Sequence, residues 1–408
     1  MLEKIGEKVV IDLDNKMTSI SIFLRLKELQ MMICSKMLVR ILSLCLFPHL
    51  LCVFSVSAQF KPVEIFNKMF NDTAASSANK WIAYPTIAYA PETSWEIGAA
   101  AILVYYANKD TSNRLSEVSG FSFFTLENQY GAHFEHALYS DKDKWFALGK
   151  LKFQSYPLFY YGIGPDIIGD ELAIAGANFT LIRERFLRKL YRNWYLGIEI
   201  DFEGLNGVDI DWLEDDYKET LIGEDGYNNL GIGLGLIYDT RHNVLNVRHG
   251  MLSEIGYLLY QPEWGSTNRL STLFLDNRFF FKTTKRNVLA FQMIGQFSQG
   301  EVPFNQLSMI GGEMMMRGYY LGKYRDKNMF GVQAEHRWLP FKFSKRLGAS
   351  VFAGIGSVSP NLHFDKFLWT AGGGLRVLIF PKRDIYTRFD VGINPDGYGL
   401  YLFIGEAF

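Results

Sequence analysis

The sequence predicts an all-β protein, an antiparallel β-barrel of sixteen strands that spans a membrane. Bulky apolar side chains alternate with small or polar ones in segment after segment from residue 81 to residue 408. Their apolar side is rich in aromatic residues, which favours contact with lipid over the alternative of a secreted soluble β protein. No segment after residue 58 approaches the ~20 apolar residues of a membrane helix. Any membrane crossing must therefore use strands, because only helices and closed barrels satisfy every backbone group in lipid.

The mature chain is expected to begin after a cleaved leader. Arg40 and the mostly apolar run behind it have the pattern of a Sec-type signal peptide. Val56-Ser57-Ala58 fits the small-residue pattern of a cleavage site. The four expected parts are an over-extended start at 1–36, the signal peptide at 37–58, a short N-terminal segment at 59–80 and the barrel at 81–408.

Charge and cysteine usage exclude several kinds of site. The formal net charge of −1 gives no argument for nucleic-acid binding. The three cysteines, Cys34, Cys45 and Cys52, all precede the expected cleavage site. The mature chain therefore offers neither a disulfide nor a thiolate metal site, and we expect no metal and no cofactor.

Each strand is placed by its alternation. In residues 194–202, for example, Trp194, Leu196 and Ile198 share one face, while Gly197 and Glu199 occupy the other. Single-chain bacterial barrels have even strand numbers, and sixteen satisfies this. The expected ranges are 81–90, 94–106, 115–125, 129–139, 144–154, 171–185, 193–203, 229–240, 250–260, 270–282, 287–298, 328–338, 347–356, 368–380, 384–393 and 398–408.

The first and last strands are expected to meet in a weak seam. Pro85 lies in the first strand, and proline within sheets is confined to edges and bulges because it cannot donate a hydrogen bond. The last strand ends on an aromatic residue, Phe408, and alternates up to it. A terminal aromatic in such a strand is similar to the signal that the barrel-assembly machinery reads during biogenesis. We therefore predict that Pro85 and Phe408 mark the seam.

The connections between strands differ in length and charge. Short, often basic turns are expected on the periplasmic side, and the long loops at 155–170, 204–228 and 299–327 on the cell surface. The acidic stretch between Asp209 and Asp225 has no ligand spacing of an EF-hand. We interpret it as a solvated loop in preference to a cation site.

One long loop carries Ile310-Gly-Gly-Glu-Met-Met-Met-Arg-Gly-Tyr-Tyr-Leu-Gly322, and the strand behind it places Gln333, Glu335 and Arg337 on one face. This combination resembles the sixth-loop Arg-Gly-Phe/Tyr element of the BamA/TamA-like outer-membrane superfamily, the bacterial surface antigen barrels. The resemblance implies that the sixth extracellular loop folds inward and that its arginine contacts acids of the inner wall. The loop-lock residues would be Arg317, Gly318, Tyr319 and Glu335.

Other segments extend or limit the resemblance. Residues 160–165 and 238–243 look like the family's Phe/Tyr-Gly-Ile-Gly and Asp-Thr-Arg-Asp-Asn elements. Ala353 and Gly354 stand where a second acid is expected, so the lock rests on Glu335 alone or uses another inward acid such as Asp390. The segment 59–80 is too short for a periplasmic POTRA module, so we expect a member without POTRA domains. In this family the seam is a lateral gate.

These observations favour a non-enzymatic barrel of the bacterial outer membrane, acting in membrane biogenesis or in translocation of protein or lipid. The alternatives are a passive small-solute channel and, more remotely, a barrel hydrolase using inward charges. His133 and His136 point to opposite faces of one strand, and no catalytic motif occurs. Expected partners are outer-membrane lipid and lipopolysaccharide, with an unknown protein or a homo-oligomer also open.

Overall fold

The computed structural model describes residues 79–90, 94–126, 128–167, 171–213, 216, 218–241 and 243–408. The expected over-extended start, the signal peptide and residues 59–78 lie outside these ranges. In the described chain the strands form one large sheet and one two-stranded sheet, and no helix is long and apolar enough to cross a membrane. The strands are β1 (Lys80–Ala90), β2 (Ser94–Tyr106), β3 (Leu115–Thr125), β4 (Tyr130–Tyr139), β5 (Trp145–Ser155), β6 (Leu158–Tyr160), β7 (Ala173–Tyr191), β8 (Trp194–Trp212), β9 (Tyr227–Asp239), β10 (Gly250–Tyr260), β11 (Leu270–Lys282), β12 (Asn287–Gly300), β13 (Ser308–Ile310), β14 (Tyr324–Asp326), β15 (Asn328–Trp338), β16 (Leu347–Ser359), β17 (Leu368–Phe380), β18 (Ile385–Asn394) and β19 (Gly397–Ile404).

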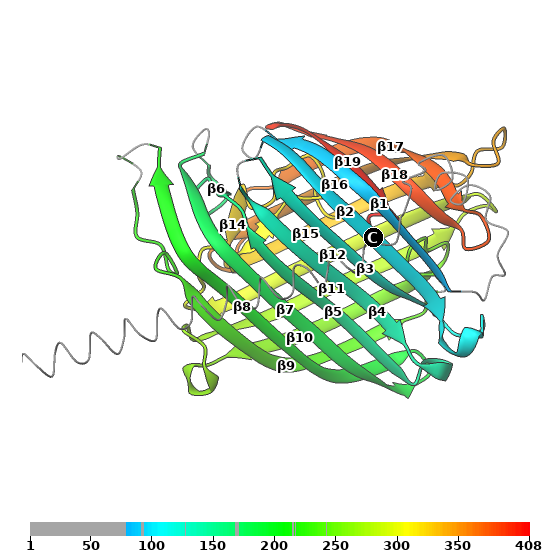
Figure 1. Ribbon diagram of the computed structural model, residues 1–408, viewed down its shortest axis with the longest axis horizontal. Helices are drawn as coiled ribbons and strands as arrows, with labels where there is room; N and C mark the ends of the chain where they lie inside the picture. The colour runs from blue at the N-terminus through cyan, green and yellow to red at the C-terminus, as the bar shows by residue number, and fades with distance from the viewer. Residues whose placement is uncertain are drawn as a thin grey trace, which may run out of the picture. The chain divides into compact units, whose positions relative to one another are not determined.

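The large sheet has 17 strands and is antiparallel throughout. Almost every strand pairs with the strand that follows it in the chain, so that in Figure 1 the strands run side by side with a common tilt. The three-residue β6 continues the line of β5 along β7, with which both strands pair. The strands β13 and β14 pair with each other inside the loop between β12 and β15. No backbone pairing joins β1 to β19 among the described residues.

Alternation divides the two faces of the sheet. On β15, Gln333, Glu335 and Arg337 are almost completely buried, and the face that carries them is called the inner face below. The outer face carries the bulky apolar side chains that the sequence assigned to lipid, including Trp194 and Ile198, which are 42% and 51% exposed. Exposed aromatic and aliphatic residues on this scale are typical of a surface that faces lipid and not water.

The strands β7 and β8 are longer than expected, with 19 residues each. They continue to pair beyond the predicted end at residue 203, as far as Ala173 opposite Trp212. Asp209 and Asp211 therefore lie in a strand, and the prediction of a loop from residue 204 is wrong for the part that β8 occupies. Apolar neighbours such as Val208 and Ile210, packed on a buried cluster around Phe304, explain why this acidic stretch stays ordered.

The prediction of a strand up to Phe408 is also wrong, since β19 ends at Ile404. Gly405 adopts a φ of +92° and turns the chain inward. The Glu406 carboxylate then forms an ion pair with Arg376 at 2.9 Å, and the ring of Phe408 stacks near Phe280 of β11. These contacts hold the last residues against the inner face and away from the end of the sheet.

The connection between β9 and β10 also folds inward. Leu245 packs in a buried cluster with residues of β2, β3, β17 and β18, and its carbonyl oxygen accepts a hydrogen bond of 3.0 Å from the Glu406 N–H. Arg248 binds both carboxylate oxygens of Asp384 at 2.6 and 2.7 Å, which ties this connection to the turn before β18. Strands far apart in sequence are therefore joined at one end of the sheet.

Candidate functional site

The loop between β12 and β15 carries the first candidate site. Its backbone lies against β18, where Gly318 and Gly392 face each other. Gly318 adopts a φ of +114°, and a Cβ there would lie 2.8 Å from Asn394 Nδ2 and 3.0 Å from the backbone of Gly392. A Cβ on Gly392 would collide with the carbonyl of Arg317. Two glycines thus permit the close approach of loop and wall.

Arg317 projects from this loop into the interior and is completely buried. Its Nη2 lies 2.5 Å from Glu335 Oε2 on β15, and its Nη1 lies 2.5 Å from Asp390 Oδ2 on β18. The guanidinium carbon sits 3.5 Å from the ring centroid of Phe352 on β16. Two carboxylates and one aromatic face therefore hold a single arginine, in a geometry that suits the flat guanidinium.

A wider ion network surrounds this contact. Glu335 also contacts Arg337 at 2.8 Å and Arg376 at 3.1 Å. Asp390 also contacts Arg376 at 2.5 Å and Arg388 at 2.8 Å. All these charged groups are buried, so each depends on the others, because an unpaired buried charge is costly. The network joins β15, β17 and β18 to the loop.

Polar contacts fix the loop on either side of Arg317. Thr370 Oγ1 donates to the carbonyl of Arg317, and the Gly318 N–H donates to the hydroxyl of Tyr401 at 2.8 Å. The hydroxyl of Tyr319 donates to the carbonyl of Trp369 at 3.1 Å. Burial raises the pKa of Tyr319 to about 12. This hydroxyl therefore stays protonated and continues to donate at physiological pH.

The structure brings Arg317, Gly318, Tyr319 and Glu335 together, and Asp390 supplies the second carboxylate. Sequence reasoning missed four residues that complete the site, on strands β16 to β19. They are Phe352, Thr370, Gly392 and Tyr401. The sequence showed only that these side chains lie on the inward side of their strands, since nothing local links them to a loop 35 to 84 residues earlier in the chain.

The two residues predicted at the seam lie apart from each other. Pro85 is exposed on β1 opposite Ala99 of β2, at the edge of the described sheet. Phe408 is 4% exposed, and its main-chain oxygen accepts a hydrogen bond of 3.1 Å from Arg337. The described contacts of Phe408 are with β11, β12 and β15, because the turn at Gly405 leads the chain inward. The prediction that Phe408 lies in the closing strand is therefore wrong.

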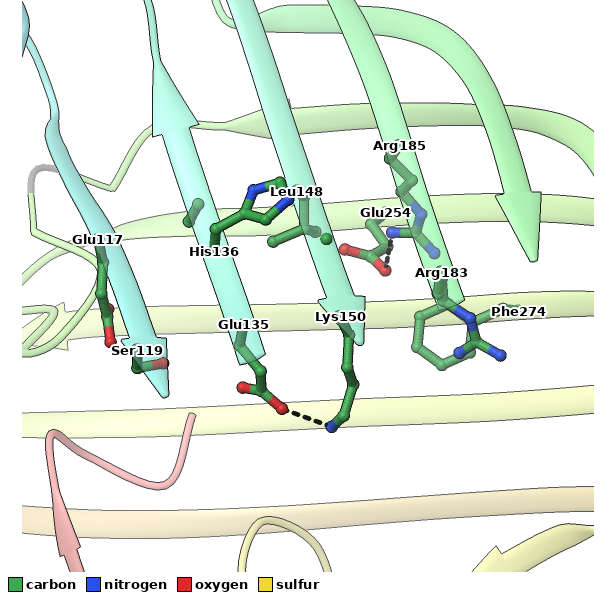
Figure 2. A pocket seen from close by; sticks show the side chains of 12 residues that line it. Glu117, Ser119, Glu135, His136, Leu148, Lys150, Arg183, Arg185, Glu254 and Phe274 are labelled. Carbon is green, nitrogen blue, oxygen red and sulfur yellow. Dashed lines mark hydrogen bonds and ion pairs between the residues drawn. The ribbon is translucent and has the colours of Figure 1, made fainter. Parts of the chain in front are cut away.

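A second candidate site is a cavity of about 280 Å³ lined by residues of β3, β4, β5 and β7, together with Glu254 of β10 and Phe274 of β11. Figure 2 shows the Lys150 ammonium reaching the Glu135 carboxylate, a contact of 2.6 Å. The Arg185 guanidinium contacts Glu254 at 2.6 Å. The cavity is lined by charges of both signs that largely neutralise one another.

The inward charges considered for a hydrolase are already paired. Glu199 contacts Arg185 at 2.9 Å, and Asp201 contacts Arg183 at 2.6 Å. Asp239 contacts Arg241 at 3.0 Å. In the described part of the chain, no three His, Cys, Asp or Glu side chains are grouped so that they could hold a metal ion.

An antiparallel sheet with a lipid-type outer face, and a loop anchored inside it by a buried arginine, defines a membrane-spanning β-barrel protein. The profile described as the Omp85 superfamily domain matches residues 124–408. The chain belongs to the Omp85 superfamily, and it is accordingly an outer-membrane β-barrel protein of bacteria. The predicted membership of the BamA/TamA-like superfamily is thereby confirmed.

Two solved structures of CdiB share the fold at low sequence identity. CdiB from Acinetobacter baumannii has a TM-score of 0.52 at 13% identity over 80% of this chain, and CdiB from Escherichia coli has 0.51 at 12% over 80%. The chain spans 59% and 61% of those two proteins. BamA from Haemophilus ducreyi lacking POTRA domains 1–3 has a TM-score of 0.48 at 15% identity, covering 80% of this chain and 68% of that one. No curated protein matches the sequence.

Proposed function

We propose that this protein inserts or translocates other proteins at the outer membrane, without an enzymatic step, through a barrel whose interior is occupied by the Arg317 loop. The observation that carries the proposal is the burial of Arg317 between Glu335 and Asp390. The loop contacts the inner face of five strands, β15 to β19. Burying ionic groups costs free energy unless each is paired, so an arrangement in which every charge has a partner indicates that the loop position is functional. A loop that fills the interior also argues against a wide, steadily open solute pore.

The proposal includes closure of the sheet. Without the three-residue β6, the large sheet has sixteen strands. We propose that these form the barrel wall and that β1 and β19 lie next to each other. Their edges would form a seam without a regular ladder, since Pro85 cannot donate and the chain leaves β19 at Gly405. Such a seam could open sideways to pass a strand of a client protein into lipid.

Reconstitution tests the transport function. We expect liposomes containing the protein to accelerate the folding of a urea-unfolded eight-stranded outer-membrane barrel, followed by its heat-dependent mobility on gels. Lys150→Ala, at an inner-face lysine that pairs with Glu135, is the matched control for Arg317→Ala. Equal folding rates in empty and loaded liposomes, together with a large steady conductance, would instead establish a passive channel.

A further inference from the structure

The outer face of β4, β5 and β7 carries a polar pair that the loop lock does not use. His136 Nε2 of β4 lies 3.1 Å from Glu184 Oε2 and 3.2 Å from Oε1 of β7. Gly149 of β5 lies between them in register with both, and any Cβ there would collide with the imidazole and the carboxylate. Three adjacent strands therefore combine to form the pair, and the glycine leaves the space for it.

Alternation assigns the pair to the surface that faces lipid. Phe134 and Phe186, each two residues away on the same strands, are 52% and 51% exposed. The adjacent residues Glu135 and Arg185 belong to the inner face, where they form ion pairs with Lys150 and Glu254, although the cavity described above also touches His136 and Gly149. The side chains of His136 and Glu184 keep exposed fractions of 19% and 22%.

The pair also lies deep within the lipid-facing band. Towards one membrane surface, the Arg188 guanidinium lies 5.6 Å from the Trp145 ring, and we take this pair as one edge of the lipid-facing band. The two residues are four positions along their strands from Glu184 and Gly149. Four residues of a strand tilted by about 45° span ~9 Å of depth. Tyr130, six residues from His136, marks the opposite level ~14 Å away. These depths add up to the roughly 25 Å height of an outer-membrane apolar band.

Lipid leaves this pair incompletely satisfied. Both oxygens of Glu184 share one donor atom, Nε2 of His136, although a carboxylate can accept about four hydrogen bonds. The hydrocarbon of a bilayer offers no water to fill the remaining positions. Ionisable groups exposed to lipid are costly and mark functional sites as a rule. We therefore expect a partner molecule to contact the outer face at Gly149 and to donate a hydrogen bond to the Glu184 carboxylate.

We propose that this partner is a second copy of the chain, and that the β4–β5–β7 outer face forms a two-fold symmetric dimer interface in the membrane. A histidine–glutamate pair is its own complement under two-fold rotation, because each Glu184 then meets the partner's His136. Small outer-face residues next to the pair, Ala147 and Gly149, allow the two walls to approach closely. The proposal does not depend on the transport function.

Disulfide crosslinking in native membranes tests the interface. Cys34, Cys45 and Cys52 are first replaced by serine, and Leu151→Cys then places one thiol on the outer face of β5, two residues from Gly149. Val351→Cys, 50% exposed on the outer face of β16, is the matched control. We expect a crosslinked dimer with Leu151→Cys and none with Val351→Cys.

Two further variants separate recognition from folding. The double variant His136→Leu/Glu184→Leu places apolar groups in lipid, so the barrel should fold, as heat-dependent gel mobility will show, while the crosslinked fraction falls at least about tenfold. The exchanged variant His136→Glu/Glu184→His retains a self-complementary pair and should restore the dimer. Two results would overturn the proposal. One is undiminished crosslinking in the double leucine variant, and the other is the absence of a crosslinked dimer when Leu151→Cys is the only change besides the three serine replacements.

Discussion

At the scale of residues, Arg317 makes the contacts that contribute most to holding the loop against the inner face. It is completely buried between Glu335 and Asp390, and its guanidinium lies on the ring of Phe352. Neither carboxylate could remain buried and charged without cations, and Arg376 serves both of them. The lock is thus a network, and its single members cannot be exchanged independently.

Arg317→Ala is expected to destabilise the folded barrel by about 3–5 kcal/mol, because it leaves two buried carboxylates with one cation fewer. Lys150→Ala removes an ion pair with Glu135 in which both side chains are about half exposed, at 47% and 54%, and should cost no more than about 1 kcal/mol. Urea unfolding in lipid vesicles measures both free energies. An equal decrease in the free energy of unfolding in the two variants would show that the Arg317 network stabilises the barrel no more than an exposed ion pair does.

Gly318→Ala should destabilise the loop more than Gly312→Ala does. Both glycines have positive φ, and both substitutions carry the left-handed cost of roughly 1–2 kcal/mol. At Gly312 the added Cβ would meet nothing closer than 3.7 Å, whereas at Gly318 it lies 2.8 Å from Asn394 Nδ2. Thermal unfolding of both variants checks this order. A reversed order would mean that the loop is not pressed against β18.

Sequence reasoning found Arg317 and Glu335 because the loop and the strand behind it resemble an element of a known family, and it named Asp390 as an alternative acid because of its inward place on a strand. It did not find Phe352 or Tyr401, which are ordinary members of their strands. Their roles arise only when the loop folds against β16 and β19, and no local pattern records that long-range contact.

At the scale of elements, strand alternation was a reliable guide wherever both faces are in use. The strands β10, β11 and β15 have the expected bounds, since lipid on one side and polar groups on the other enforce the period of two. The errors fall at strand ends. Contacts with distant segments decided those ends: packing against the cluster around Phe304 extends β8, and the turn at Gly405, which leads to the Glu406–Arg376 ion pair, shortens β19.

The loop between β12 and β15 should loosen in alkali. The pKa of Tyr319 is raised by burial from its ordinary value of 10.0 to about 12. The neutral hydroxyl therefore contributes stability that is fully present below about pH 10 and is lost as the pH rises toward about 12. We expect protease cleavage of the loop to increase between these values, and less steeply in Tyr319→Phe. An identical pH profile in both proteins would contradict this assignment.

At the scale of the whole molecule, the proposed transport function requires a defined orientation of the barrel in the outer membrane. The connections that contain Asp216 and the Arg317 loop share a cluster around Phe304, so they leave the sheet at the same end. The inward connection at Leu245 and the end of the chain occupy the other end. Short turns of this kind face the periplasm in bacterial barrels.

A tag or protease site next to Asp216 should be accessible on intact cells, because the long connections are expected on the cell surface. A matched tag next to Lys342, in the short turn between β15 and β16, should become accessible only after the outer membrane is broken. The opposite pattern would reverse the orientation.

The central claim, that the buried Arg317 contact keeps the loop inside the barrel, is tested most directly by conductance in planar bilayers. We expect the parent protein and the control Lys150→Ala, which loses a half-exposed ion pair with Glu135, to stay closed or to open only briefly. Arg317→Ala should give large, long-lived openings, because the loop loses its anchor to Glu335 and Asp390. A large steady conductance in the parent protein, or an Arg317→Ala barrel as closed as the parent, would contradict the account.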